Sequence, residues 1–179
     1  FRAVRIVNEA AGGRPGGDRE TAPNHGPEAA RRLPKLLPGI NLLHGLKGER
    51  EETYEHNRQF LQRVLDEGLM LRRINIRQVM AFEGTDMAET GASVAHAHKE
   101  QFKQYKSEIR ETVDNPMLQR VAPPGTVLPD VHLEYHQDGK TFGRQLGTYP
   151  LLVAIPGERE LGQRLDVAIT DHGYRSVTG

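Results

Sequence analysis

The sequence predicts an α/β domain with a parallel sheet or barrel, followed by a small all-β domain. An apolar run at 40–46 ends in a glycine-rich turn at 45–49 and leads directly into a charged helical pattern. A second strand-like run at 71–82 precedes a long polar helical pattern, so strands and helices alternate. After Pro116 the pattern changes to short alternating runs separated by glycines and prolines, which is typical of a small antiparallel barrel or sandwich.

The elements of the first domain, expected over 1–117, follow from periodicity and turn residues. An amphipathic helix opens the chain and ends at Gly12-Gly13. Residues 12–35 are rich in glycine, proline and charge, and we expect an inserted loop. A helix over 51–68 follows the first strand, and a long polar helix over 93–114 follows the second. The expected inner faces of these two helices are Tyr54, Leu61, Val64 and Leu65, and Phe102, Tyr105 and Ile109.

The second domain, expected over 118–179, has strand-like runs at 131–135, 149–155 and 165–170. The chain opens on Phe1 inside an apparent helix and stops at Gly179 directly after a strand-like run. We therefore expect a piece of a longer protein. A truncated parallel sheet leaves an open edge, which predicts self-association of the piece.

Composition favours no single class of partner. The 179 residues carry 24 basic and 24 acidic side chains, with a mean hydropathy of −0.62. Neutral net charge gives no overall attraction to nucleic acid or membrane, so only a local patch could supply one. The chain has no cysteine, which excludes disulfides and thiolate metal sites within it. No apolar run reaches the roughly 20 residues of a membrane span and no secretory signal is visible, so we expect a cytoplasmic protein without a membrane partner.

The turn at 45–49 is the first candidate site, because ligands of parallel α/β folds bind at the carboxyl ends of the strands. Gly45 and Gly48 would let the backbone approach a ligand, and free amides at the start of the next helix would meet its polar atoms. Glu49 is expected to order the loop by capping that helix. The alternative is an ordinary strand-to-helix turn without a ligand.

The second strand supplies a further pair of candidates. Ile74 and Ile76 share one face of the strand, so Asn75 and Arg77 share the other. If the isoleucines pack on the outer helices, Asn75 and Arg77 point into the barrel. Arg77 would suit a carboxylate or an anionic substrate, and the alternative is a buried ion pair with a neighbouring carboxylate.

Three histidine- or lysine-containing patterns have simpler interpretations. His132, Glu134 and His136 alternate along a strand and would share a face, which could bind metal but is more often the wet side of a sheet. His96 and His98 diverge on a helix, which favours solvated side chains. The run at 139–141 ends like a phosphate loop but lacks the upstream glycine, so a hairpin turn is expected.

Several cationic and aromatic residues of the second domain could form an RNA-binding surface, in which bases stack on aromatics while cations follow the phosphates. The alternative is a scattered, solvated surface. The residues concerned are Arg144, Tyr149, Arg159, Arg164, His172, Tyr174 and Arg175.

Three segments together resemble radical S-adenosylmethionine (SAM) enzymes of the methylthiotransferase type. The run Gly45-Leu46-Lys47-Gly48-Glu49 resembles their Gly-Phe-Pro-Gly-Glu segment, and the run at 80–88 resembles the loop after their next strand. From about 118 onward the chain is similar to a TRAM domain, a small RNA-binding β-barrel, through Gly143-Arg144 and the closing run at 177–179 among others. The likeness is greatest to an uncharacterised archaeal group of radical SAM proteins that carry a helix-hairpin-helix segment.

The resemblance implies the C-terminal half of a radical SAM partial TIM-type barrel followed by a TRAM- or OB-like antiparallel β-barrel. It implies SAM and a 4Fe-4S cluster as cofactors, with the cysteines of the Cys-x-x-x-Cys-x-x-Cys motif upstream of Phe1. Asp86 stands in place of the usual proline and Phe82 in place of a frequent arginine. The reaction implied for the parent protein is reductive cleavage of SAM, used for the modification of RNA or tRNA. This piece alone would be inactive.

The resemblance also implies a set of binding residues. Those for the cofactor are Gly45, Gly48, Glu49, Asn75, Arg77 and Met80. Those for RNA are Arg144, Tyr149, Arg164 and Arg175. The alternative function is an RNA-binding β-barrel module on a non-catalytic α/β scaffold.

Overall fold

A computed structural model describes residues 1–11, 33–34, 36–88, 92–147, 150–173 and 175–179. The chain forms two compact units, with the division between Met117 and Leu118. The sequence places its domain boundary at the same point. Most of the expected inserted loop at 12–35 lies outside the described residues, but Leu33 packs against the core of the second unit.

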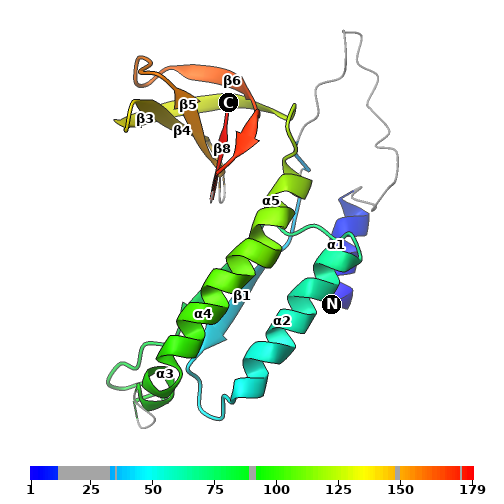
Figure 1. Cartoon of the computed structure of the whole chain (residues 1–179), viewed down its shortest axis with the longest axis vertical. Helices are drawn as coiled ribbons and strands as arrows, with labels where there is room; N and C mark the ends of the chain where they lie inside the picture. Colours follow the sequence, from blue (N-terminus) through cyan, green and yellow to red (C-terminus); the bar gives the residue numbers. More distant parts are fainter. Residues whose placement is uncertain (12–32, 35, 89–91, 148–149, 174) are drawn as a thin grey trace. The chain divides into compact units, whose positions relative to one another are not determined.

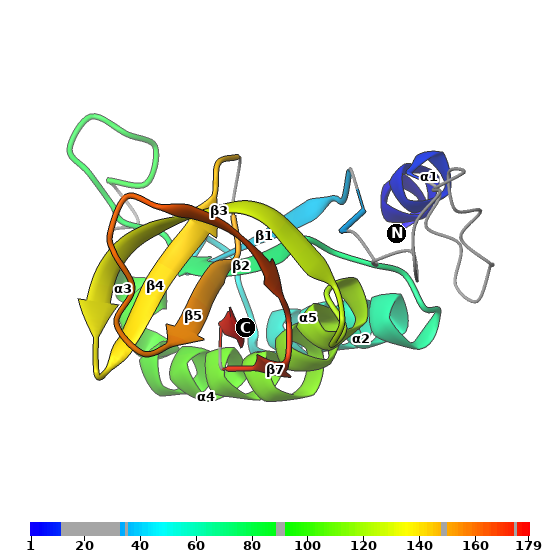
Figure 2. The ribbon, with the colours of Figure 1, turned by 90° about the horizontal axis from the view of Figure 1, so that it is seen from above.

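The first unit alternates helices and two parallel strands (Figure 1). Strands β1 (Gly39–His44) and β2 (Arg73–Gln78) pair in parallel, with Gly39 opposite Arg73 and His44 opposite Gln78. Both are shorter than the predicted runs at 40–46 and 71–82. Helices α2 (Glu51–Asp66) and α4 (Lys99–Ile109) lie side by side on one face of this sheet (Figures 1 and 2). The other helical elements are α1 (Arg2–Ala10), α3 (Ser93–Ala97), η1 (Arg110–Asp114) and α5 (Asn115–Val121).

The predicted inner faces of the two long helices are confirmed. Tyr54, Leu61, Val64 and Leu65 of α2 are buried, and so are Phe102, Tyr105 and Ile109 of α4. The buried residues of helix α1 are Val4 and the polar Asn8. Asn8 compensates for its burial by exchanging hydrogen bonds with the backbone of Met70, at 2.8 Å and 2.9 Å.

The helix predicted to end at 114 continues to Val121. Its continuation passes through the π-helical turn η1 and includes Pro116. In a π-turn the hydrogen bonds skip one residue, which accommodates a proline that has no N–H to donate. The change of pattern at Pro116 therefore marks the approach to the second unit but not the end of the helix.

One face of the parallel sheet is covered by helices and the other is exposed in this chain. Ile74 of β2 is 3% exposed on the covered face. On the opposite face Asn41, Leu43 and Arg77 are exposed and Asn75 is half-buried. We call these four residues the open sheet face. Parallel sheets are normally covered on both faces.

The second unit is a curled six-stranded sheet, with the strand order β6-β3-β4-β5-β8-β7 (Figure 2). Its core includes Leu128, Leu133, Val153, Ile155 and Val177. Strands β5 and β8 pair in parallel, so the expectation of a purely antiparallel barrel is wrong at this pair. The strands are β3 (Val127–Gln137), β4 (Lys140–Gln145), β5 (Leu152–Pro156), β6 (Arg164–Ala168), β7 (Asp171–His172) and β8 (Ser176–Thr178).

Strand β3 carries an irregularity that changes which side chains face outward. The register with β4 shifts between Leu133 and Tyr135. Tyr135 therefore lies opposite the half-buried Phe142, and their rings stack at 5.1 Å between centroids. His136 instead lies opposite the fully buried Thr141. The expectation that His132, Glu134 and His136 share one face is wrong, because the shift reverses the alternation after Glu134.

The hairpin between β3 and β4 turns at Asp138 and Gly139, which have φ angles of 52° and 69°. The run at 139–141 is thus part of a hairpin, as the sequence predicts. Gly143 of β4 passes so close to β3 that an added Cβ would lie 2.5 Å from the carbonyl oxygen of His132. Only glycine permits this approach, which helps the sheet to curl.

Candidate functional site at the ends of the parallel strands

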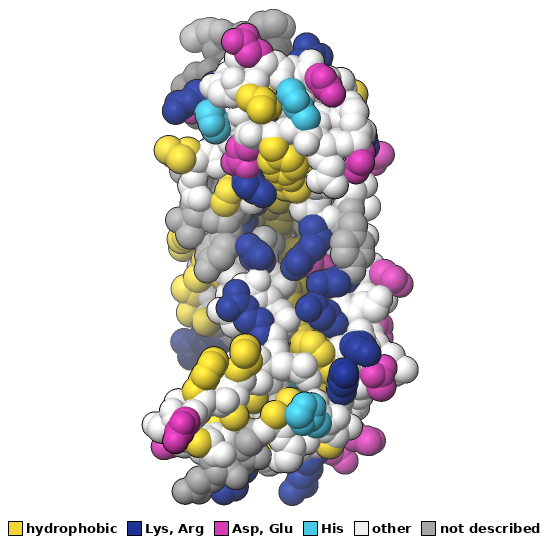
Figure 3. All heavy atoms as spheres, turned by 90° about the vertical axis from the view of Figure 1, so that its left-hand side faces the viewer, with side chains coloured by type: hydrophobic (Ala, Val, Ile, Leu, Met, Phe, Trp, Pro, Cys, Tyr) yellow, Lys and Arg dark blue, Asp and Glu magenta, His cyan; other side chains and the backbone are white. Residues whose placement is uncertain are grey.

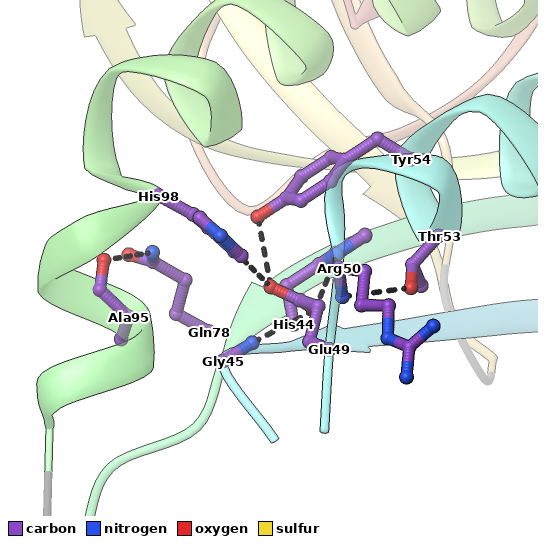
Figure 4. A network of polar contacts seen from close by, with 9 residues as sticks. All are labelled: His44, Gly45, Glu49, Arg50, Thr53, Tyr54, Gln78, Ala95 and His98. Atoms are coloured by element: carbon purple, nitrogen blue, oxygen red, sulfur yellow. Dashed lines mark hydrogen bonds and ion pairs between the residues drawn. The ribbon is translucent and has the colours of Figure 1, made fainter. Parts of the chain in front are cut away.

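The loop after β1 contains a buried carboxylate that accepts hydrogen bonds from four sides (Figure 4). The Glu49 side chain is 3% exposed. Its Oε2 accepts from the amide of Gly45 and from Nδ1 of His44, both at 3.0 Å. Its Oε1 accepts from the Tyr54 hydroxyl at 3.1 Å and from Nδ1 of His98 at 3.2 Å. Because a carboxylate only accepts, each imidazole carries its proton on Nδ1. We call these five residues the Glu49 network.

Each member reaches the network from a different element. His44 ends β1 on the covered face of the sheet, in the same alternation as Ile40 and Leu42. Tyr54 lies in the first turn of α2 and stacks on the His44 ring at 4.3 Å between centroids. His98 lies between α3 and α4. The network therefore joins the strand end to two helical segments.

Gly45 has two reasons to be glycine. Its φ angle is +88°, and an added Cβ would lie 2.9 Å from Cβ of Ala95 and 3.1 Å from Cγ1 of Val79. Its amide donates a hydrogen bond to the Glu49 carboxylate. The turn is filled by the chain's own carboxylate.

Glu49 orders the loop, but it does not cap the following helix as expected. The start of α2 is stabilised instead by Thr53, whose hydroxyl accepts a hydrogen bond from the amide of Arg50 at 3.2 Å. Glu49 points away from this helix end and into the network (Figure 4). Gly48 is exposed with a φ angle of +85° and would meet nothing within 4 Å if it carried a Cβ. Its role is conformational.

The electrostatics of the network follow from burial and hydrogen bonding. Burial alone would raise the pKa of the Glu49 carboxyl, but the bonds from His98 and Gly45, with His44 and Tyr54, hold that pKa below its usual value. Burial lowers the pKa of His44 despite the attraction of Glu49. Burial, together with the neighbouring Glu49 charge, raises the pKa of Tyr54. Glu49 is thus an anionic carboxylate beside the neutral rings of His44 and Tyr54 at pH 7.

The open sheet face lies on the other side of the same two strands. Asn75 donates a hydrogen bond to Asn41 across the sheet at 2.8 Å, and Arg77 lies opposite Leu43. The prediction that Asn75 and Arg77 lie opposite the buried Ile74 is confirmed. Arg77 is exposed, so the alternative of a buried ion pair is wrong. The face offers amides and one guanidinium, which are donors for a carboxylate or a phosphate.

The remaining cofactor candidate, Met80, is 71% exposed and lies two residues beyond β2, outside the Glu49 network. The structure thus joins Gly45 and Glu49 in one hydrogen-bonded unit. It places Asn75 and Arg77 on the opposite face of the sheet. Gly48 and Met80 belong to neither group.

Two of the RNA candidates of the second unit, Arg144 and Arg164, form ion pairs with carboxylates. Arg144 bonds Glu134 at 2.6 Å, and Arg164 bonds Asp130 at 3.1 Å. Arg175 is exposed, and Tyr149 lies outside the described residues. Each of the two paired arginines has its charge offset by a neighbouring carboxylate. The stacked pair Tyr135 and Phe142 is the aromatic feature that the sequence did not indicate.

His44, Tyr54 and His98 were not predicted as site residues. The expectation that His98 is solvated is wrong, because its side chain is 19% exposed and bonds Glu49, while His96 is exposed as expected. The signal for His44 was present in the strand alternation, which places a polar residue on the covered face where it needs a partner. His98 had no such signal.

The described residues contain neither a metal-ligand cluster nor a membrane-spanning helix. Over the residues that the structure describes, no group of three histidine, aspartate or glutamate side chains could hold a metal ion. None of the helices in that part of the chain combines the length and apolar character needed to cross a membrane.

Comparison with known proteins gives two uncharacterised archaeal relatives. The chain is 47% identical over its whole length to an uncharacterised protein of Methanocaldococcus jannaschii, and spans 31% of that protein. It is 44% identical over 82% of its length to an uncharacterised protein of Archaeoglobus fulgidus, and spans 27% of that protein. The chain therefore spans about a third of the length of these relatives. No protein-family model matches the chain.

Proposed function

We propose that this chain is part of a radical SAM enzyme that acts on RNA, and that the open sheet face holds part of the SAM molecule. The observation that carries the proposal is the exposed Arg77 near the carboxyl end of a parallel strand, beside the paired amides of Asn41 and Asn75. Sites of parallel α/β folds lie at this end of the strands. The resemblance of the turn at 45–49 to the corresponding segment of these enzymes supports the same position.

The residues present fit one cofactor and not the other. A guanidinium and two amides suit the carboxylate and the ribose hydroxyls of SAM. A 4Fe-4S cluster needs thiolate ligands, and the chain has no cysteine, so the ligands would come from the remainder of the parent protein. When bound and reduced, SAM supplies the adenosyl radical that abstracts hydrogen from a substrate. This chain would bind and orient the cofactor and exclude water.

The Glu49 network would support the site without contacting the ligand. Its carboxylate has two hydrogen bonds on each oxygen, so it has little capacity left to bind another molecule. It fixes the end of β1 relative to α2 and the start of α4. Support of this kind holds a binding surface in one geometry before the ligand arrives.

The experiment uses the full-length parent protein, purified without oxygen and reduced with dithionite in the presence of SAM. We expect 5′-deoxyadenosine, detected by mass, and its loss when the upstream cysteines are replaced. Absence of the product from protein with a loaded cluster would refute the proposal.

SAM affinity gives a second readout. Arg77→Gln should weaken SAM binding by roughly 10- to 100-fold, as expected for a lost hydrogen bond between charged groups. Arg63→Gln is the matched control, since Arg63 is an exposed arginine of α2 and does not lie on the open sheet face. Equal affinity of the two variants would argue against the open sheet face as the site.

The second candidate function is an RNA-binding module on a non-catalytic scaffold. The observation that favours it is the stacked pair of Tyr135 and Phe142 on β3 and β4, since half-buried aromatic rings offer a surface on which bases stack. RNA affinity that falls in Phe142→Ala, in a protein that never forms 5′-deoxyadenosine, would favour this module over the enzyme.

A further inference from the structure

Helix α4 and the residue after it gather basic side chains along one side, although the chain as a whole is neutral. Lys99, Lys103, Lys106 and Arg110 follow one another at spacings of four, three and four residues. This spacing places all four on one side of the helix, within a band about 60° wide at ~100° per residue. The band runs for about 16 Å at a rise of ~1.5 Å per residue. We call these four residues the basic stripe.

Acidic side chains, most of them from α2, gather between α2 and α4. A groove of ≈440 Å³ lies between the two helices. Four glutamates line it, together with other residues, namely Glu51, Glu52, Glu55 and Glu108. Arg58 bonds Glu55 and Glu108 from within this groove, which leaves it acidic overall. A polyanion would be repelled from the groove and attracted to the basic stripe.

Figure 3 looks onto the side of the first unit where α3 and α4 lie, and there Lys and Arg side chains gather over the helical part of the molecule. The contacts of Lys103 and Lys106 within the chain are weak. Lys103 bonds Glu100 at 2.8 Å, with both side chains more than half exposed, and Lys106 lies 5.7 Å from the centre of the Phe102 ring. Exposed ion pairs contribute little and are screened by salt, so phosphates can compete with them.

We propose that the basic stripe binds the phosphate backbone of RNA. This inference rests on the RNA substrate of the proposed function and assigns RNA contact to the first unit. A line of cations without a pocket suits a chain of phosphates better than a single anion. An anionic membrane is less suitable, because membrane-surface helices need an exposed apolar face and the apolar residues Phe102, Tyr105 and Ile109 of α4 are buried.

The experiment measures binding of a labelled mixed-sequence RNA oligonucleotide to the full-length protein by fluorescence anisotropy, over a series of salt concentrations. The variant is Lys99→Gln with Lys103→Gln and Lys106→Gln. We expect binding to weaken on the order of 10- to 100-fold at low salt. The slope of log affinity against log salt should fall by about 2, since each single-strand phosphate contact contributes ~0.7.

The matched control is Arg2→Gln with Arg5→Gln and Arg63→Gln, which removes the same charge from exposed positions on α1 and α2 of the same unit. Circular dichroism establishes that both triple variants are folded. Equal weakening in the two variants would show an effect of net charge alone and would overturn the inference. Failure of the unmodified protein to bind RNA, or binding to anionic vesicles instead, would overturn it as well.

The outcome is separable from that of the proposed function. Formation of 5′-deoxyadenosine from SAM without RNA should be unchanged in the stripe variant, because none of its residues lies on the open sheet face. Loss of RNA binding with no SAM cleavage in any variant would support the stripe and reject the enzyme. SAM cleavage by the unmodified protein, with unchanged RNA binding in the stripe variant, would support the enzyme and reject the stripe.

Discussion

Replacement of Gly45 by alanine tests whether the turn after β1 is built by packing. The φ angle of +88° is unfavourable for any residue with a Cβ, by about 1–2 kcal/mol. The new Cβ would also lie 2.9 Å from Cβ of Ala95 and 3.1 Å from Cγ1 of Val79. Overpacking of this kind costs about 1–3 kcal/mol. We therefore expect Gly45→Ala to lower the free energy of unfolding by about 2–5 kcal/mol.

Gly48→Ala is the matched control, because Gly48 has nearly the same backbone conformation, with a φ angle of +85°. A Cβ at this position would meet nothing within 4 Å. It should therefore lose only the conformational part, about 1–2 kcal/mol. The difference between the unfolding free energies of the two variants isolates the cost of the contacts with Ala95 and Val79.

The assay is urea denaturation followed by circular dichroism at a helix-sensitive wavelength, since nearly all the described helical residues belong to the first unit. Ala95→Gly in the Gly45→Ala background removes the nearest atom and should recover part of the loss. Equal destabilisation by Gly45→Ala and Gly48→Ala, with no recovery in the double variant, would refute the packing argument.

Four further predictions concern the same unit. Glu49→Gln should destabilise the unit by about 2–4 kcal/mol, because charge-assisted hydrogen bonds are lost from a buried group. The control, Glu51→Gln at an exposed position, should cost less than about 1 kcal/mol, and urea denaturation of both variants measures the difference. Because burial lowers the pKa of His44, the unfolded chain takes up a proton below about pH 6.5 that the folded chain resists, so the stability should fall as the pH drops below this value. His44→Gln should flatten that fall, and an unchanged slope would contradict the assignment. Asn8→Ala leaves the backbone of Met70 without its side-chain partner and should loosen α1, seen as faster hydrogen exchange of the α1 amides, with the exposed Glu9→Ala as control. The chain alone should self-associate through the edge of the β1–β2 sheet, and a strictly monomeric sedimentation profile at high concentration would count against it.

The periodicity of apolar residues within one helix or strand correctly predicted which of its side chains face the core. The alternation along β2 predicted the face of Asn75 and Arg77, because the apolar Ile74 faces the core and its neighbours in the alternation face the other side. The inner face of α2 followed from its helical period in the same way. These predictions depend on neighbours within one element, and a single sequence contains that information.

The predictions that failed depend on contacts between elements or on a one-residue irregularity. His98 reaches Glu49 across 49 residues, and nothing near either residue indicates the partner. The register shift in β3 turns Tyr135 outward, and a strict alternation rule cannot foresee an inserted residue. Pro116 read as a helix end because the π-turn before it has no sequence signature.

The different roles of Glu49 and Arg77 at the strand ends follow from the hydrogen bonds that each side chain already makes within the chain. Glu49 is ionised, buried and accepts two hydrogen bonds on each oxygen, so it is poorly suited to act as a base or as a ligand for a cofactor. Arg77 is charged and exposed near the end of the adjacent strand. The four hydrogen bonds to Glu49 hold the end of β1 rigid, and an exposed donor on a rigid strand binds with little reorganisation. In the proposed function, ligand binding would therefore belong to the open sheet face, and the Glu49 network would determine the geometry in which that face is presented.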